Sequence, residues 1–206
     1  DIGYYFPDGA TVRGQRETRT GTWKQVNSSS AWGSTTPYTR NYLSLSVDHG
    51  VNPSGGGYSY VLLPNATKAQ TAAYSAAPAV SILENTAAVQ AVRHEGLGVT
   101  GINFWEDGPT TAASVTTDSK ASVMLAETAD EIEVSVSDPT QQNVGMIYLT
   151  IDRAATGLIA KDPAVTVLQY SPTIKLKVDV QKARGASFTG RFALTGAASP
   201  NPAPIA

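Results

Sequence analysis

Hydrophobic and polar residues alternate with a period of two along much of this chain. The clearest alternation lies in segments 43–48, 131–136 and 174–180, where each apolar residue neighbours a polar or charged one. Successive side chains of a β-strand point to opposite faces of its sheet, so this pattern predicts strands with one face on a core and the other in water. Strands of this kind are typical of antiparallel sheets.

Further strands are predicted in less regular segments that are separated by turns. They are residues 11–18, 22–26, 58–63, 80–84, 87–94, 98–104, 122–127, 145–151, 165–170 and 187–194. Glycine, proline, aspartate and asparagine gather between them, and these residues favour turns. Many short strands at this spacing predict an all-β fold of antiparallel β-sandwiches.

One segment, residues 66–77, is predicted to be a short helix that connects two β stretches. Asn65 or Thr67 can cap its first N–H groups, and Pro78 ends it. We therefore place a domain boundary there, with residues 1–77 in one domain and residues 78–206 in the other. The tail, residues 197–206, carries three prolines and no pattern, and we expect it to be extended.

The amino-acid composition argues against several classes of function. The net charge is -2, which supplies no electrostatic attraction to nucleic acid or to an anionic membrane surface. No apolar run reaches the length of about 18 residues that a membrane span needs. The absence of cysteine excludes disulfides, thiolate metal sites and a cysteine nucleophile. We expect no nucleic-acid partner and no membrane partner.

The chain begins at Asp1, without an initiator methionine or a signal peptide, and its first methionine is Met124. We therefore expect a processed or excised piece of a longer protein. A chain shortened artificially for expression is the alternative.

The two histidines do not predict a catalytic centre. His49 follows Asp48, a sequence that suggests an Asp–His pair for proton transfer. Adjacent strand residues point to opposite faces, however, so we interpret His49 as a hydrogen-bonding turn residue. His94 is expected to have a structural or exposed role. The sequence therefore predicts no catalytic residue.

No metal site or cofactor is predicted either. Asp107 and Asp118 lie in turns and could bind calcium weakly, but turn chemistry explains both equally well. The sequence has no nucleophile elbow, phosphate-binding glycine loop or dinucleotide fingerprint.

The loop of residues 27–40 is the segment most suited to contact a ligand. It holds Trp32, Tyr38 and Arg40 among serine, threonine and glycine. Aromatic rings stack on the apolar faces of sugars, and arginine pairs with carboxylates through its fork of N–H groups. These three residues are candidates for substrate binding, and a surface loop with a packed tryptophan is the alternative. Trp23 and Trp105 lie in strand patterns and are expected to pack in the core.

Several stretches, in order, carry a resemblance to a known family. They are Ile2-Gly3-Tyr4-Tyr5-Phe6, Gly21-Thr22-Trp23-Lys24-Gln25-Val26-Asn27, Tyr42-Leu43-Ser44-Leu45, Asp48-His49-Gly50, Tyr58-Ser59-Tyr60-Val61-Leu62-Leu63-Pro64, Ile82-Leu83-Glu84-Asn85-Thr86, Val89-Gln90-Ala91-Val92, Asn103-Phe104-Trp105 and Val136-Ser137-Asp138-Pro139-Thr140-Gln141. Over roughly residues 1–194 this series resembles polysaccharide lyases of family 8, the hyaluronate, chondroitin and xanthan lyases.

The resemblance implies a division of labour within a longer enzyme. In that family an N-terminal α/α toroid precedes a central β-sandwich and a smaller C-terminal β-sandwich. Residues 1–77 would then be the end of the central sandwich, and residues 78–206 the C-terminal one. The family performs β-elimination at a uronic acid with an Asn, a His and a Tyr of the helical domain. No position of this chain matches those residues.

The leading hypothesis is therefore a structural, cleft-lining part of a secreted, extracellular lyase, inactive on its own. Its partners would be an acidic polysaccharide, with hyaluronan or chondroitin favoured over xanthan, and the N-terminal part of the same enzyme. Residues 1–77 alone would leave an apolar sheet face exposed. A stand-alone carbohydrate-binding module and a purely structural domain of a surface protein are the alternatives.

Overall fold

The computed structural model describes residues 1–7, 9–29 and 31–194, and the chain divides into two compact units. The smaller unit is Phe6–Val61, and the larger unit combines Asp1–Tyr5 with the chain from Leu62 onward. Strand pairing is antiparallel throughout the sheets whose register is known. The all-β prediction is confirmed. Residues 197–206, expected to be extended, lie outside the described residues.

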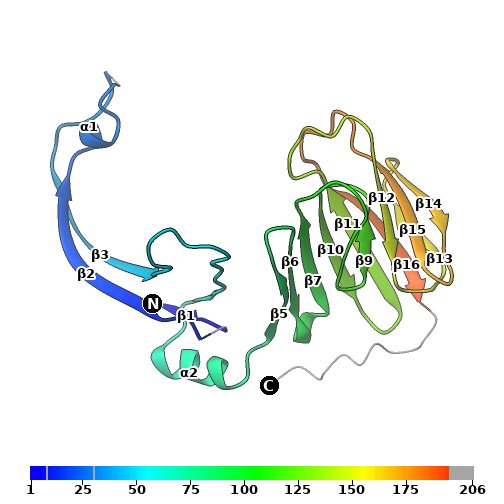
Figure 1. The fold of residues 1–206 in the computed structure, drawn as a ribbon, viewed down its shortest axis with the longest axis horizontal. Helices are drawn as coiled ribbons and strands as arrows, with labels where there is room; N and C mark the ends of the chain where they lie inside the picture. Colours follow the sequence, from blue (N-terminus) through cyan, green and yellow to red (C-terminus); the bar gives the residue numbers. More distant parts are fainter. Residues whose placement is uncertain (8, 30, 195–206) are drawn as a thin grey trace. The chain divides into compact units, whose positions relative to one another are not determined.

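The smaller unit is built on one long β-hairpin, β2 (Val12–Gly21) and β3 (Tyr38–Val47), shown in blue in Figure 1. The strands pair in register from Val12 opposite Val47 to Gly21 opposite Tyr38. We call the Gly21–Tyr38 end the tip of the hairpin and the Val12–Val47 end its base. The connection at the tip contains a short helix, α1 (Trp23–Val26).

The helix α1 corrects the prediction of a strand at residues 22–26. The Thr22 side chain accepts a hydrogen bond from the Gln25 backbone N–H (3.3 Å), and the Gln25 side chain accepts one from the Thr22 N–H (2.8 Å). This capping box satisfies N–H groups that a helix start leaves open, so local bonding outweighs the strand propensity of the segment. Trp23 is 64% exposed, so the expectation that it packs in the core is wrong.

One face of the hairpin changes character from base to tip. Near the base, the predicted strand is confirmed, and Leu43 and Leu45 lie on one face. They are 57% and 37% exposed, so the expected contact of this face with a core is not made within the described residues. Nearer the tip, the same face carries hydroxyl and amide groups, and Thr18 donates to the Asn41 side chain over 2.7 Å. The base of this face is apolar and suited to packing against another protein surface, whereas the tip is polar and suited to contact with solvent.

The larger unit begins with a two-stranded sheet and a helix. Strand β1 (Ile2–Tyr5) pairs with β4 (Val61–Pro64), and helix α2 (Lys68–Ala76) packs on β1. At Gly3 the helix comes so close that a Cβ atom would lie 2.2 Å from the Thr71 Oγ1. Only glycine permits this approach without a shift of the helix or the strand.

The predicted helix at residues 66–77 is confirmed, and its N-cap is Thr67 rather than Asn65. The Thr67 hydroxyl accepts from the Gln70 N–H (3.3 Å), and the Gln70 side chain accepts from the Thr67 N–H (2.9 Å). Asn65 instead has a positive φ of 59°, in the left-handed region that asparagine tolerates.

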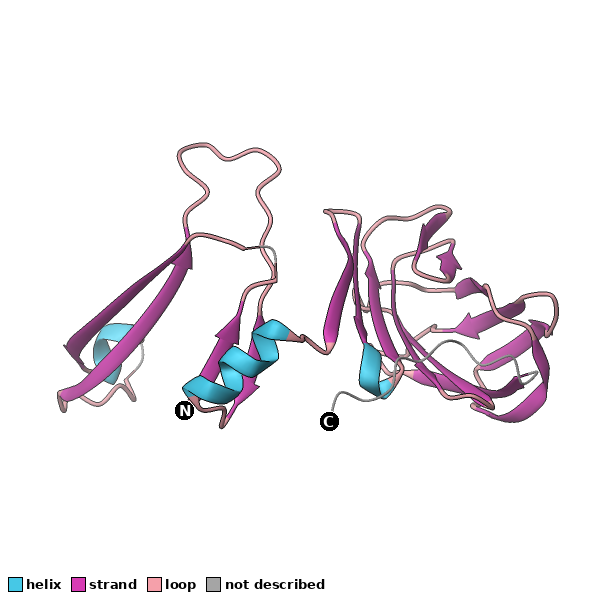
Figure 2. Ribbon diagram, turned by 90° about the horizontal axis from the view of Figure 1, so that it is seen from below, coloured by secondary structure: helices cyan, strands magenta, loops and turns pink. Residues whose placement is uncertain are grey.

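The rest of the larger unit is a β-sandwich of two antiparallel sheets (Figures 1 and 2). One sheet has seven strands in the order β13-β16-β11-β10-β7-β6-β5, and the other has five in the order β14-β15-β12-β9-β8. The strands are β5 (Val80–Asn85), β6 (Val89–His94), β7 (Val99–Phe104), β8 (Thr110–Ala112), β9 (Val115–Thr117), β10 (Ala121–Glu127), β11 (Glu131–Ser137), β12 (Met146–Ile151), β13 (Ala155–Lys161), β14 (Val165–Gln169), β15 (Ile174–Asp179) and β16 (Phe188–Leu194), with a 3-10 turn η1 (Glu95–Leu97) after β6.

Alternation along these strands builds the core. In β11, the side chains of Ile132, Val134 and Val136 are buried, and those between them are only partly buried. Strand β15 repeats this pattern. Phe104 at the end of β7 is fully buried, so the next residue, Trp105, points outward and is 42% exposed. The expectation that Trp105 packs in the core is therefore wrong.

Strand β13 is an edge strand that the sequence did not predict. Its residues show no clean alternation, and its register with β16 is interrupted twice by bulges. Bulges at a sheet edge blunt pairing with other chains. The short strands β8 and β9 were also not predicted.

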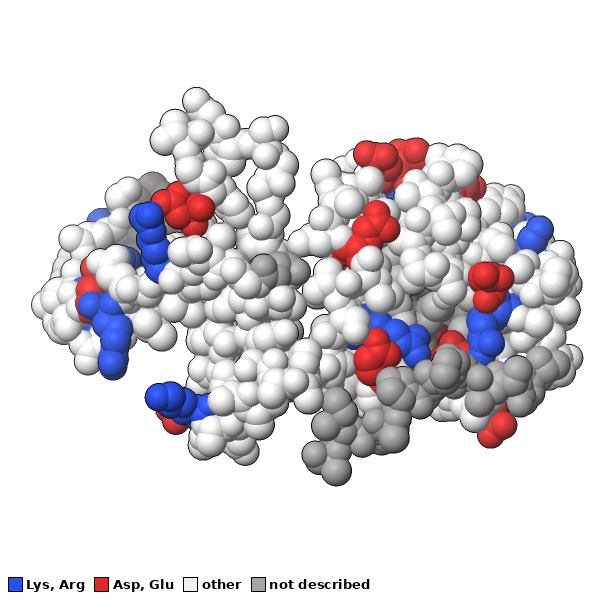
Figure 3. Space-filling model, turned by 60° about the horizontal axis from the view of Figure 1, so that its bottom comes forward, with Lys and Arg blue, Asp and Glu red and all other residues white. Residues whose placement is uncertain are grey.

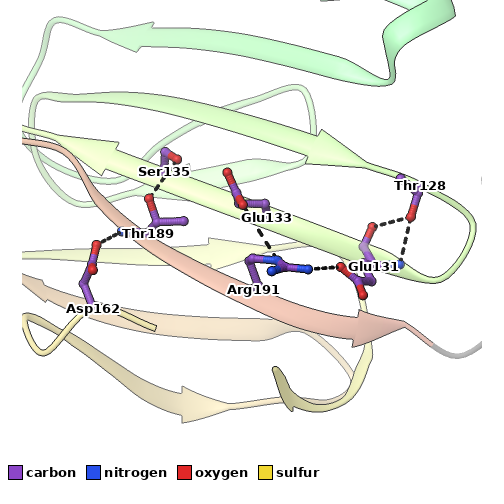
Figure 4. A network of polar contacts seen from close by, with 7 residues as sticks. All are labelled: Thr128, Glu131, Glu133, Ser135, Asp162, Thr189 and Arg191. Carbon is purple, nitrogen blue, oxygen red and sulfur yellow. Dashed lines mark hydrogen bonds and ion pairs between the residues drawn. The ribbon is translucent and has the colours of Figure 1, made fainter. Parts of the chain in front are cut away.

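A polar network on the outer face of the seven-stranded sheet joins β11 to β16 (Figure 4). The Arg191 guanidinium lies 2.6 Å from the Glu131 carboxylate and 3.8 Å from that of Glu133. Hydrogen bonding to Glu131 raises the pKa of Arg191 itself. The Ser135 and Thr189 hydroxyls lie 3.2 Å apart on the same pair of strands. These contacts hold the two strands in register.

Candidate functional site

Two of the three predicted ligand-contacting residues lie side by side at the tip of the hairpin. Tyr38 is the first residue of β3, and Arg40, two positions on, lies on the same face of the strand. The Arg40 guanidinium carbon is 5.7 Å from the centroid of the Tyr38 ring, a cation–π arrangement. Trp32 lies in the connection between α1 and β3 and is 94% exposed, so it is not buried in a core.

Three further residues of this face, Glu17, Arg19 and Tyr42, were not among those predicted from the sequence. Arg19 of β2 is directly opposite Arg40, and its guanidinium carbon is 5.8 Å from the centroid of the Tyr42 ring. Tyr42 shares the face of Tyr38 and Arg40 because it follows Arg40 by two positions. Alternation would have grouped the three β3 residues, but only the pairing register identifies Arg19.

The two guanidinium groups have different surroundings. Arg19 forms an ion pair with Glu17, two residues earlier on β2. The hydrogen bond that Arg19 donates to the Glu17 carboxylate, together with the negative charge of Glu17, raises the pKa of Arg19. Arg40 donates to the backbone oxygen of Thr39 over 2.8 Å, and it makes no ion pair with any residue that the structure describes.

We call Glu17, Arg19, Tyr38, Arg40 and Tyr42 the arginine face of the hairpin. It offers guanidinium forks for an anion and ring faces for the C–H surface of a sugar. It contains no histidine, and its one carboxylate is held by an arginine. The arrangement is suited to binding an acidic ligand rather than to general acid–base chemistry.

The Asp48–His49 pair is not assembled for proton transfer. Asp48 forms an ion pair with Arg13 (3.1 Å) and accepts the N–H of Gly50 (2.8 Å). The His49 ring instead lies beside Tyr58, with ring centroids 6.2 Å apart. The interpretation that Asp48 does not orient His49 is confirmed.

His94 and the two turn aspartates have structural partners. The His94 ring accepts the N–H of Leu97 over 3.2 Å and so caps η1, as its expected structural role requires. Asp107 pairs with Lys120 (3.4 Å), and Asp118 accepts the backbone N–H of Tyr148 (2.9 Å).

Residues 1–7, 9–29 and 31–194 contain no group of three or more His, Cys, Asp or Glu side chains that could hold a metal ion. In the same residues, no helix has both the length and the apolar character to cross a membrane. Charged side chains of both signs are interspersed on the face drawn in Figure 3.

Comparison with known protein families gives two adjacent matches. Residues 1–75 match the model for the super-sandwich domain of polysaccharide lyase family 8, and residues 81–146 match the model for the C-terminal beta-sandwich domain of that family.

Individual relatives agree with the family models. A xanthan lyase of Bacillus sp. (strain GL1) is 54% identical over 195 residues, which cover 94% of this chain and 21% of the relative. A hyaluronate lyase of Thermasporomyces composti is 34% identical over 184 residues, covering 89% of this chain and 23% of the relative. The solved structure of a Paenibacillus xanthan lyase superposes with a TM-score of 0.87 at 55% identity, over 99% of this chain and 20% of that one. The chain thus spans about a fifth of the length of these relatives.

Proposed function

Since this chain belongs to polysaccharide lyase family 8, we propose that it is the β-sheet portion of a secreted, extracellular enzyme that cleaves acidic polysaccharide by β-elimination at a uronic acid. In this proposal residues 1–77 complete a central sandwich and residues 78–206 form the C-terminal one. The portion supports the enzyme and lines its cleft, and the chain alone is inactive.

The chemistry of elimination supports the absence of catalytic residues from this portion. The reaction needs a base, an acid and a group that neutralises the uronate carboxylate, all within hydrogen-bond reach of one another. Among the described residues, each histidine is used structurally or lies beside an aromatic ring, as at His94 and His49. As the family resemblance implies, the proposal places the reacting Asn, His and Tyr in an N-terminal helical domain of the full enzyme.

One observation carries the proposed cleft role. The Arg40 guanidinium lies over the Tyr38 ring and forms no ion pair with any described residue, so it can pair with a ligand. The face of the hairpin that carries Leu43 and Leu45 becomes polar toward the tip. This pattern fits a hairpin whose base packs against other parts of the enzyme and whose tip is in solvent. Arg40 would pair with a carboxylate of the polysaccharide, and Tyr38 and Trp32 would stack on neighbouring sugar rings.

The identity of the polysaccharide that the enzyme cleaves also belongs to the proposal. Hyaluronan and chondroitin were favoured from the sequence, and the 54% identical relative is a xanthan lyase. All three polymers carry carboxylates, so the arginine face suits each of them. Xanthan is therefore tested beside hyaluronan and chondroitin.

Calorimetric titration of the chain with oligosaccharides of the three polymers tests the proposal. Arg40→Ala is expected to weaken binding of the recognised oligosaccharide by about ten- to 150-fold, because a charge-assisted hydrogen bond contributes about 1.5–3 kcal/mol. Arg16→Ala removes the same charge from the opposite face of β2 and is the control. Equal loss in both variants, or no binding by the unaltered chain, would contradict the cleft role.

The exposure of Trp32 favours a second function, a stand-alone carbohydrate-binding module. Micromolar affinity of the chain for a glycan, abolished by Trp32→Ala, is the result expected of such a module. A polysaccharide that binds the chain only weakly but is cleaved by the longer enzyme favours the cleft role instead.

A further inference from the structure

The outer face of the seven-stranded sheet carries a line of outward positions along β7, a central strand of that sheet (Figure 1). Gly101 and Asn103 are outward positions of β7, and Trp105 follows in line directly after the strand. Same-face positions of a strand lie about 6–7 Å apart, so the three residues span about 13 Å. We call these residues, with Val92 of β6 and Met124 of β10 on either side of Gly101, the β7 strip.

Gly101 leaves a gap at one end of the β7 strip. A Cβ atom built on this glycine would meet no heavy atom within 4 Å other than those of its chain neighbours, so the flanking side chains do not lean over it. Val92 and Met124, its partners on the two neighbouring strands, are 41% and 47% exposed. The backbone of β7 is therefore open to a ligand between two apolar side chains.

The polar groups of the β7 strip are held in place by their neighbours. The Trp105 indole N–H donates to the side-chain oxygen of Gln90, whose own amide group donates to the backbone oxygen of Thr86. The Ser122 hydroxyl donates to the side-chain oxygen of Asn103 over 2.7 Å, and the Asn103 amide N–H groups donate to no other described residue. The 42% exposed indole thus offers a ligand its ring, and Asn103 offers hydrogen-bond donors.

Two rows of cross-strand partners around the β7 strip carry no charge. One row is Asn85, Gln90, Asn103, Ser122 and Ser137, and the other is Ile82, Val92, Gly101, Met124 and Ser135. The charged network of Glu131, Glu133 and Arg191 lies on β11 and β16, farther across the same sheet (Figure 4). An uncharged ligand therefore matches the β7 strip, whereas a carboxylate would find no counter-charge in these rows.

We propose that the β7 strip is a second polysaccharide-binding surface, distinct from the arginine face, and that it holds an uncharged stretch of a β-linked glucan. The flat C–H face of one glucose ring stacks on Trp105, and a second ring enters the gap at Gly101 between Val92 and Met124. Asn103 donates to a hydroxyl group between the two rings. This inference goes beyond the proposed function and rests on it only in taking a polysaccharide as the ligand.

NMR titration of the 206-residue chain with cellohexaose tests the β7 strip. Amide resonances of β6, β7 and β10 are expected to shift, and the affinity should be the same at low salt and at about 0.5 M salt because no ion pair forms. Trp105→Ala is expected to weaken binding at least about tenfold, since a tryptophan at the centre of a contact dominates its affinity. Trp23→Ala, at another exposed tryptophan, is the control and should change nothing.

Gly101→Val tests the gap without removing a side chain from the β7 strip. The space for a Cβ is open and the φ of Gly101 lies outside the left-handed region, so the variant should keep the fold. The added side chain fills the gap and is expected to weaken cellohexaose binding at least about fivefold. Gly157→Val, at an equally open glycine in the edge strand β13 of the same sheet, is the matched control. Circular dichroism and melting temperatures verify that each variant is folded.

The outcomes separate this inference from the proposed function. No shift with cellohexaose, or unchanged affinity in both Trp105→Ala and Gly101→Val, would overturn the β7 strip and leave the cleft role of the arginine face intact. Loss of cellohexaose binding in Arg40→Ala would place the glucan on the hairpin and also overturn the strip. A hyaluronan hexasaccharide should shift the β7 resonances less than cellohexaose does, and equal shifts would contradict the choice of an uncharged ligand. Failure of the cleft role appears instead as unchanged binding of acidic oligosaccharides in Arg40→Ala.

Discussion

A buried aspartate shows how a single side chain can hold a turn together. Asp138 follows β11 and is 3% exposed. Its carboxylate accepts the N–H (2.8 Å) and hydroxyl (2.7 Å) of Thr140 and the N–H of Asn143 (2.8 Å). Burial alone would raise the pKa of Asp138, but these hydrogen bonds outweigh it and the pKa is lowered.

The lowered pKa of Asp138 predicts a stability contribution that depends on pH. The contribution is present above the unfolded-state pKa of about 3.9 and is lost as the pH falls through the lower folded-state value. Asp138→Asn should lower the free energy of unfolding by about 1–3 kcal/mol at neutral pH. Urea denaturation at pH 7 and pH 3 should show this difference shrinking at the lower pH. Asp130→Asn, in an exposed turn, is the control, and an equal effect of both changes would contradict the role of Asp138.

The core of the sandwich depends on a few large side chains, of which Phe192 is one. Its ring is fully buried, and it meets the Tyr170 ring edge-on at 6.3 Å between centroids. Phe192→Ala should cost about 3–5 kcal/mol of unfolding free energy because it leaves a cavity. Leu168→Ala, at a position 53% exposed, should cost far less. Thermal denaturation of both variants measures the difference in stability. Similar losses of unfolding free energy in the two variants would contradict the central role of Phe192 in the core.

At the scale of elements, helix α2 owes its start to a capping box. Thr67→Ala removes an acceptor for the Gln70 N–H and should cost about 1 kcal/mol, whereas Thr67→Ser keeps the hydroxyl and should cost little. Faster amide hydrogen exchange over Lys68–Ala76 in the alanine variant alone is the expected result. Unchanged exchange in both variants would show that packing on β1 fixes the helix without its cap.

Sequence patterns predicted elements where one physical signal dominated. Strands β11 and β15 alternate cleanly because one face is buried, and α2 lies between a capping residue and Pro78. The patterns failed where local bonding or an edge position decided the outcome, as at α1 and β13. Tyr38 and Arg40 could be chosen as candidates from the sequence because an aromatic ring and a guanidinium group suit an acidic sugar. The role of Arg19 depends on a cross-strand register that the turn and the pairing set, and no local pattern encodes it.

At the scale of the whole molecule, the two units differ in how fully their apolar residues are covered. The sandwich buries a continuous core, whereas Leu43 and Leu45 of the hairpin remain exposed within this chain. We propose that further parts of the enzyme cover this face. Limited proteolysis of the chain should therefore cut within Phe6–Val61 before it cuts the sandwich. First cuts within the sandwich strands would contradict the predicted order of stability.

The central claim is that this portion supports and binds while the chemistry takes place elsewhere in the enzyme. The most direct test is the ultraviolet absorbance of the unsaturated product when the chain is incubated with xanthan, hyaluronan or chondroitin. The chain alone should produce no increase, and a longer protein that adds the N-terminal helical domain should produce one with at least one of the three. Turnover by the 206-residue chain alone would contradict the account.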